Sequence, residues 1–559
     1  MTQWRFAAAI LLLIFVGLPV GLPFIGVFRN PAGWQAWSEA WRLLSLAGTT
    51  LELVAGTLIF VLPLGVAGAV FLYRTDLPFR RGLRFLTFLT LFVPLPLFTS
   101  AWQATLGTGG LLPVALWTNV SAGDPDISPA GTGMKPWGHG PGTAIWVHAM
   151  AGLPWVILLV GQGLLWVERE LEEDALTAAG PWRVLWRVTL PRCRAAIFAS
   201  GLWVALMIVT EITVSDMMQV RTFAEEVYSQ LVEGNREALV RAVAISLPAI
   251  VLAAGLVVFG SSRWERSLPP LETLTAPPRL IPLGIGRWLC LAGILFFIGV
   301  LAGVPLVSLI WKAGLSGSPE AWSAHVTLIY LTQTLRDRGR IIMESLAVAA
   351  GSGALTAGLA LVLCWLATGS RWFHAFALGL MAVVWAMPGP ILGLGMKDAI
   401  SRILDVFPLH ALAVALYYGP SPVPVVWVDV VRFFPCAVAV LWPVLRLIPM
   451  ELRDAARVDG ARPRQELQHV VLPLAVPACV RAGLAVMVLS LGEIAAGKLA
   501  ATPGSLTFAQ EIFDRMHYGV TNDLAALCLI LLAAVILSGC IFGALNWWLS
   551  RTRPADMRM

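Results

Sequence analysis

The chain has little charge for its length. Of its 559 residues only 13% are Asp, Glu, Lys or Arg, whereas 58% are hydrophobic, and the mean hydropathy is +0.78. An average globular domain carries about 25% charged residues. The shortage of charge therefore excludes a soluble protein of this size, and the hydrophobic excess predicts a membrane protein.

The sequence also lacks the motifs of common hydrolases. No H-E-x-x-H and no G-x-S-x-G sequence occurs, so neither a zinc protease nor an α/β-hydrolase is indicated. The phosphate-binding loop G-x-x-x-x-G-K-[ST] is absent as well, because its nearest match, AAGKLA at 495–500, has neither the first glycine nor the final Ser or Thr. We therefore expect no catalytic residues, and a chain that cannot hydrolyse ATP.

Cysteine and histidine are few and scattered. The seven Cys include no C-x-x-C pair, and the seven His show no metal-ligand spacing. We expect buried free thiols, no metal site and no cofactor bound by this chain. The net charge of +6 is spread over short loops, which does not indicate a nucleic-acid partner.

Long hydrophobic runs are abundant. Many reach the roughly 20 residues that a helix needs to cross a bilayer, and lipid requires every backbone polar group to be bonded within the protein. These runs predict an all-α membrane protein with about twelve transmembrane helices. The expected spans are roughly 6–28, 49–73, 84–105, 143–167, 194–217, 240–261, 287–311, 342–368, 373–396, 425–448, 475–497 and 523–549.

The distribution of basic residues predicts the orientation. Most Arg residues fall in loops on one side, whereas the long loop at 106–142 on the other side holds only Lys135. The positive-inside rule then places both termini in the cytoplasm. The region 312–340 fits least well, because four basic residues fall outside: Lys312, Arg336, Arg338 and Arg340.

The chain contains an internal repeat. VTLP ends at Pro191 and VVLP at Pro473, and a Glu follows each proline after twenty residues. The heptapeptides TFAEEVY and TFAQEIF follow in the same order. We therefore predict two parallel six-helix repeats, related by a pseudo-two-fold axis along the membrane normal. The first half is residues 1–261, the cytoplasmic linker 262–286 and the second half 287–559.

A polar segment lies at the same place in each half, at 170–191 and 451–473. Both begin with acidic residues and Ala, which suit a helix start, and both contain a Gly that permits close approach by another surface. Each segment could insert into a pocket of a partner protein, or it could be an amphipathic helix on the lipid surface. Two segments at matched positions favour the partner.

The second segment closely resembles the EAA motif of ABC importer permeases, with Asp in place of the usual Glu. Its matching residues are Asp454, Ala455, Ala456 and Gly460, followed by VVLP. The first segment matches less well, because Leu replaces the second Ala and its glycine lies two residues nearer to the Leu-Pro. Its corresponding residues are Asp174, Ala175 and Gly180.

This resemblance implies the type I ABC importer permease fold, in a fused form similar to ferric-iron and thiamine permeases of the bacterial inner membrane. In that family the motif is a coupling helix. It implies two copies of a separate ATPase subunit, which bind ATP and Mg²⁺, together with an extracytoplasmic substrate-binding protein and the surrounding lipid.

Acidic residues near the outer ends of spans five and eleven are candidates for the substrate path: Glu211, Asp216 and Glu493. Ionisable groups in membrane segments tend to face water or the bundle interior. They would suit a cationic substrate, but they could also cap helices or pair locally, for example Glu493 with Lys498. Asp429 and Arg432 are expected to pair on one helix face.

The leading hypothesis is an importer permease whose substrate is ferric iron, with thiamine, polyamine or phosphonate as alternatives. An ion-coupled secondary transporter is the competing class, because such proteins can also have six plus six spans. It would offer no reason for two matched cytoplasmic segments.

Overall fold

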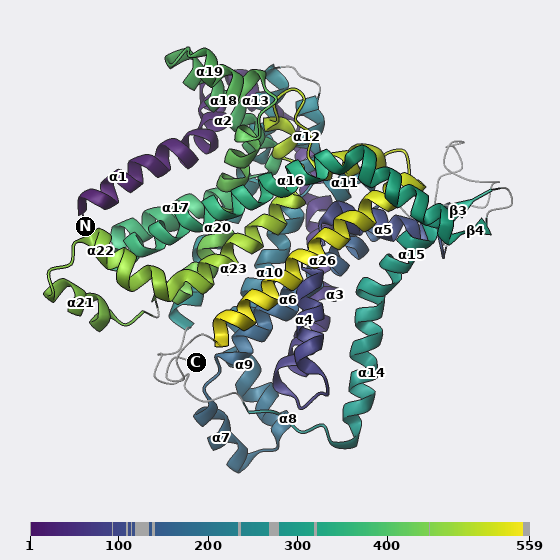
Figure 1. Cartoon of the computed structure of the whole chain (residues 1–559), viewed down its shortest axis with the longest axis vertical. Coiled ribbons are helices and arrows are strands. Elements are labelled where there is room, and N and C mark those ends of the chain that lie inside the picture. The colour runs from purple at the N-terminus through teal and green to yellow at the C-terminus, as the bar shows by residue number, and fades with distance from the viewer. Residues whose placement is uncertain are drawn as a thin grey trace.

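The protein is a bundle of helices with two small antiparallel hairpins (Figure 1). In one hairpin β1 (Ala115–Trp117) pairs with β2 (Met134–Pro136), and in the other β3 (Leu315–Ser316) pairs with β4 (Ala321–Trp322). The computed structural model describes residues 2–91, 93–107, 110–112, 115–117, 134–136, 140–232, 236–267, 279–317, 321–446 and 448–551. Most of the expected outer loop at 106–142 and part of the expected linker lie outside these residues.

The described helices confirm an all-α membrane protein. Nine of them are long and apolar enough to cross a bilayer, and twelve spans result if each of three bent helix pairs counts as one. The bends are the main difference from the predicted spans. The pairs at 80–106 and 371–406 turn by 98° and 113°, and the pair at 181–210 turns by 62°. Prolines occupy the two sharpest breaks, and proline cannot continue a helix from the preceding turn.

The first run of helices has the following order: α1 (Thr2–Leu12), η1 (Leu13–Gly17), α2 (Leu18–Arg29), η2 (Pro31–Ser38), α3 (Ala40–Arg74), α4 (Arg80–Thr90), α5 (Leu95–Leu106), α6 (Pro141–Leu165), α7 (Arg169–Ala178), α8 (Pro181–Val184), η4 (Leu185–Thr189), α9 (Leu190–Arg192), α10 (Arg194–Thr210), α11 (Thr213–Met217), α12 (Phe223–Val232) and α13 (Arg236–Ser267).

The second run of helices has this order: η6 (Gly284–Gly286), α14 (Arg287–Ile298), η7 (Gly299–Gly303), α15 (Val304–Gly314), α16 (Ala324–Ala367), α17 (Arg371–Ala386), α18 (Gly389–Val406), α19 (His410–Ala413), η8 (Val414–Tyr418), α20 (Val423–Arg446), α21 (Met450–Val458), α22 (Pro463–Glu466), η9 (Leu467–Val471), α23 (Leu472–Leu491), α24 (Gly497–Ala500), α25 (Phe508–Met516) and α26 (Asn522–Arg551).

The repeated V-x-L-P sequences mark the same irregularity in both runs. A π-helical turn, η4 or η9, ends directly before the Leu-Pro in each run. Wide turns of this kind occur inside helices where the regular bonding pattern is interrupted, as at a proline. The same device occurs in the first span of each run, where η1 and η7 precede Pro19 and Pro305. The division into halves at 261 and 287 stays a prediction, because residues 268–278 are not described.

The first span of each run packs against the other run. The indole of Trp427 in α20 donates a hydrogen bond to the carbonyl of Phe15 at 2.9 Å, and Arg5 donates to the carbonyl of Leu366 at 3.0 Å. In return, Thr105 in α5 donates to Ser308 in α15 at 2.9 Å. The hydrophobic clusters around these contacts likewise draw buried residues from both runs. The two runs therefore form one interlocked bundle.

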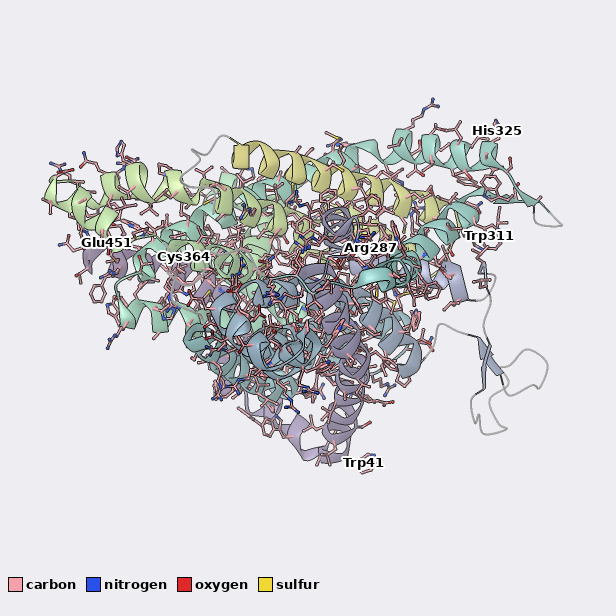
Figure 2. All side chains as sticks on the ribbon, turned by 90° about the horizontal axis from the view of Figure 1, so that it is seen from below. Trp41, Arg287, Trp311, His325, Cys364 and Glu451 are labelled. Atoms are coloured by element: carbon pink, nitrogen blue, oxygen red, sulfur yellow. The ribbon has the colours of Figure 1, made fainter. Side chains whose placement is uncertain are left out.

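Helix α16 is much longer than the predicted span at 342–368, because it begins at Ala324. Three of the four basic residues that fitted the orientation least well lie in its N-terminal half: Arg336, Arg338 and Arg340. Arg338 forms an ion pair with Glu511 at 2.8 Å, and Arg340 pairs with Glu344 at 2.7 Å. These charges are therefore neutralised within the protein. Figure 2 shows His325, near the start of α16, and Glu451, in α21, at opposite ends of the molecule.

The polar segments lie together at one side of the bundle. Figure 1 shows α7 and α21 toward the side where α1 begins and α26 ends, whereas α11 and α12 lie toward the opposite side. The first side is called the coupling side below. Helices α10 and α23 run between the two sides.

Candidate functional site

Helix α21 is fixed to the bundle by a buried ion pair. Arg453 Nε lies 2.6 Å from Glu466 Oε1, and both side chains are less than 5% exposed. Arg453 also donates to the hydroxyl of Thr368, the residue that follows α16, at 2.7 Å. Buried charges of this kind are stable only when they are paired and hydrogen-bonded. The pair therefore joins α21 to both α16 and α22.

Helix α7 is also fixed by a buried ion pair, but here the carboxylate belongs to the helix itself. Glu172 forms a buried ion pair with Arg74, the last residue of α3, and accepts a hydrogen bond from Thr189 at 2.6 Å. In each run the polar segment is thus tied to the coupling-side end of the second span. Sequence reasoning missed both pairs. The sequence feature that could have revealed these pairs is a charged residue on the apolar face of an amphipathic helix.

The predicted coupling residues of α21 face outward. Asp454, Ala455 and Gly460 are exposed, Ala456 is half-buried, and Asp454 pairs only within the segment, with Arg457 at 3.0 Å. The apolar side chain of Val458 is 86% exposed beside them. In the first segment Asp174 and Gly180 are exposed and Ala175 is half-buried.

The two glycines differ, although the sequence suggested that they were equivalent. Gly460 has φ +81°, in the left-handed region, and lies in the loop 459–462 between α21 and α22. Gly180 has φ −68° and ψ 159°, and it directly precedes Pro181, as Arg462 precedes Pro463. The two missing residues of the first segment therefore belong to this loop, while both helices are retained.

A cavity of ≈ 190 Å³ lies between the two runs. Corresponding elements of both runs line it. The first run contributes the break between α4 and α5, helix α6 and the end of α10. The second run contributes the end of α17, helix α20 and the end of α23. Gly492 allows this close meeting, since a Cβ there would lie 2.8 Å from Cβ of Pro94. The cavity is therefore a shared, pseudo-symmetric space.

Two of the three predicted path residues line this cavity, at matched breaks after α10 and α23. Glu211 accepts hydrogen bonds from the backbone N–H groups of Thr213 and Val214, and Glu493 accepts one from Ala496 at 2.8 Å. Both carboxylates therefore cap the following turn and face the cavity. The capping alternative weighed from the sequence is therefore observed, whereas a role of these residues in a substrate path stays a prediction.

Arg432 in α20 is a cavity residue that the sequence did not reveal. Its Nε lies 2.6 Å from Glu493 Oε2. The pair of Glu493 with Lys498, weighed as an alternative, does not form, because Lys498 binds Asp514 at 2.7 Å. The expected pair of Asp429 with Arg432 is also wrong.

Asp429 instead accepts hydrogen bonds from Ser352 and Ser490 inside the bundle. The third predicted path residue, Asp216, is not among the residues that line the cavity. It lies 3.0 Å from His517 Nε2 and so connects α11 with the end of α25.

Three tryptophans from both runs form one wall of the cavity. The rings of Trp155 and Trp203 are 4.9 Å apart, and those of Trp203 and Trp385 are 5.4 Å apart. They come from α6, α10 and α17, so no sequence spacing relates them. Sequence reasoning treated tryptophans as interface anchors and missed this group.

Comparison with known proteins gives the family. Residues 346–553, which include α17 to α25, match the family described as binding-protein-dependent transport system inner membrane component. Residues 346–553 therefore carry the membrane domain of an ABC importer permease. Its many apolar helices make the chain a multi-pass membrane protein, and the relatives named below are permease subunits, which are translocation components rather than enzymes.

Several proteins named as permeases are similar to this chain over part of their length. The trehalose transport system permease protein SugB of Mycobacterium tuberculosis is 27% identical over 37% of this chain and 75% of its own. The putrescine transport system permease protein PotI of Escherichia coli is 28% identical over 28% and 54%. The putative 2-aminoethylphosphonate transport system permease protein PhnV of Salmonella paratyphi A is 36% identical over 17% and 35%.

Proposed function

We propose that this permease moves a small polar molecule through the cavity between its two runs, driven by a separate ATPase that presses on α7 and α21. The observation that carries the proposal is the mechanical connection between these places. Segment Pro463–Leu491 is one helical span, and it begins beside α21 and ends two residues before Glu493. A rigid helix of 29 residues transmits a push over roughly 40 Å.

Buried polar contacts hold each polar segment rigidly to the helices that lead to the cavity. Glu466 in α22 is held by Arg453 of α21, so α21 and the start of the span move together. In the first run Glu172 and Thr189 join α7 to η4, from which α9 and α10 lead to Glu211. This second lever bends by 62° at Cys193, so the two runs respond unequally to the same push.

The partners follow from this arrangement. Two copies of an ABC ATPase subunit would each receive one exposed segment, with Asp174, Ala175 and Gly180 in one contact and Asp454, Ala455, Ala456 and Gly460 in the other. A substrate-binding protein would deliver its cargo on the side opposite to the coupling side. Both termini would then be cytoplasmic, and the chain would lie in a bacterial inner membrane.

The substrate belongs to the class of small polar solutes. The relatives above carry the names of a disaccharide, a diamine and an aminophosphonate, and these names do not support ferric iron. The lining also differs from the purely acidic one expected for ferric iron, since Arg432 neutralises Glu493. A polyamine, a phosphonate or a sugar is therefore preferred to ferric iron, and thiamine stays an alternative.

Uptake by the source cells tests this function. A strain that lacks the chain is compared with one in which it is restored, using labelled putrescine, 2-aminoethylphosphonate, trehalose, thiamine and ferric iron. We expect one of the organic compounds to enter only with the chain, and its uptake to survive a protonophore but to stop when ATP is depleted. Uptake that stops with the protonophore while ATP is maintained would instead indicate an ion-coupled secondary transporter.

A further inference from the structure

The cavity has one carboxylate that no positive side chain binds directly. Glu493 is paired with Arg432 at 2.6 Å, whereas Glu211 accepts only backbone N–H groups, from Thr213 and Val214. Each oxygen of Glu211 therefore keeps a free lone pair. With Glu211 and Glu493 ionised, the three charged lining residues sum to one negative charge. One positive group on a bound molecule would therefore neutralise the charge of the cavity.

The walls favour an organic cation over a metal ion. Trp155, Trp203 and Trp385 present indole rings to the cavity, and indole faces attract organic cations, with Trp the strongest of the aromatic side chains. A metal ion needs several oxygen, nitrogen or sulfur ligands. The described residues contain no group of three or more His, Cys, Asp or Glu side chains placed to hold one.

We propose that this cavity recognises an ammonium group on a small organic molecule, with Glu211 as its counter-ion and the three tryptophans as its wall. The carboxylate lies at the break after α10, so it is also the point at which movement of α7, passed on through η4, α9 and α10, reaches the substrate. Arg432 and Glu493 neutralise each other on the second run, which leaves Glu211 as the counter-ion for one ammonium group of the substrate. This inference rests on the proposed transport function and names its substrate class.

Binding to the purified full chain tests the assignment without any partner protein. Putrescine, 2-aminoethylphosphonate and trehalose serve as probes at millimolar concentration, and heat of binding is measured by titration calorimetry. We expect the two ammonium compounds to bind and trehalose not to bind. Glu211→Gln should weaken ammonium binding about tenfold or more, because it removes a charged hydrogen-bond acceptor while its amide oxygen can still accept a backbone N–H.

A further variant separates the loss of charge in the cavity from a general effect on folding. Glu344→Gln, at an exposed site paired with Arg340, removes a carboxylate far from the cavity and should change nothing. Unchanged binding in Glu211→Gln, or equal binding of trehalose and putrescine, would overturn the assignment.

A failure of the proposed substrate class can be distinguished from a failure of the proposed transport function. If the chain binds no ammonium compound yet ATP-driven uptake still depends on it, the substrate class is wrong and the permease function stands. If ammonium compounds bind through Glu211 but uptake follows an ion gradient, the site is right and the ATP-driven mechanism is wrong.

Discussion

Gly460 shows how one backbone angle distinguishes two segments that look alike in sequence. Its φ of +81° lies where a Cβ is strained, whereas Gly180 is extended at φ −68°. In both cases a Cβ would meet open space, so only the backbone differs. The glycine is therefore required conformationally in the second segment alone.

Alanine substitution tests this difference. Gly460→Ala should destabilise the loop between α21 and α22 by about 1 kcal/mol or more, because a non-glycine residue is strained in this conformation. Gly180→Ala should be neutral within about 0.5 kcal/mol. Thermal unfolding of the two purified variants beside the wild type measures both. Equal losses would show that the two glycines are equivalent after all.

Some functional residues could be found from sequence and others could not. Glu211 and Glu493 were found because each follows a Leu-Pro by the same twenty residues, so the repeat itself marks them. Arg432 and the tryptophans were not found, because no repeated position corresponds to them. Arg432 meets Glu493 across 61 residues of chain, and only the packing of α20 against α23 brings them together.

At the scale of elements, the coupling segments depend on buried ion pairs. Arg453→Leu should destabilise the protein by about 3 kcal/mol, because Glu466 then loses its buried partner and keeps the half-exposed Arg457 as its one charged partner among the described residues. Arg338→Leu removes a partly exposed pair with Glu511 and should cost about 1 kcal/mol or less. The melting temperatures of both variants, compared with the wild type, check this order.

The same variant tests whether α21 is a lever. If the ion pair transmits force, Arg453→Leu should uncouple the bound ATPase from substrate while leaving the ATPase attached. ATP hydrolysis by the purified complex, with and without substrate and binding protein, measures this coupling. Stimulation equal to that of the wild type would contradict the role assigned to the pair.

The interlocking of the runs depends on a close backbone approach between α2 and α18. A Cβ on Gly395 would lie 1.9 Å from the carbonyl oxygen of Pro19, and a backbone atom cannot move aside easily. Gly395→Ala should therefore destabilise the protein by about 1–3 kcal/mol. The control, Gly379→Ala in α17, has open space around its Cβ and should be neutral or slightly stabilising. Thermal unfolding distinguishes the two.

Hydropathy predicted where the apolar helices lie along the chain, but not their shapes. Prolines at 94, 96, 388 and 390 mark the places where the pairs at 80–106 and 371–406 bend. A proline fixes where a helix is interrupted, whereas the angle is set by the helices that pack around the break. The cavity lies at these breaks, so its position required the structure.

For the whole molecule, the central claim is that a separate ATPase binds on the coupling side. Gly460→Arg places a bulky charged side chain at the exposed end of α21, where a docked partner would meet it. Gly519→Arg is a matched control: it has φ +84°, is also exposed with open space around its Cβ, and follows α25 toward the opposite side. Both substitutions carry the same backbone strain.

The most direct measurement is affinity purification of the wild type and these two variants from their own membranes in a mild detergent, with the co-purified ABC ATPase quantified per chain. We predict equal amounts with the wild type and Gly519→Arg, and at least a several-fold reduction with Gly460→Arg. An ATPase that is absent from all three preparations, or retained equally by Gly460→Arg and Gly519→Arg, would contradict docking at α21.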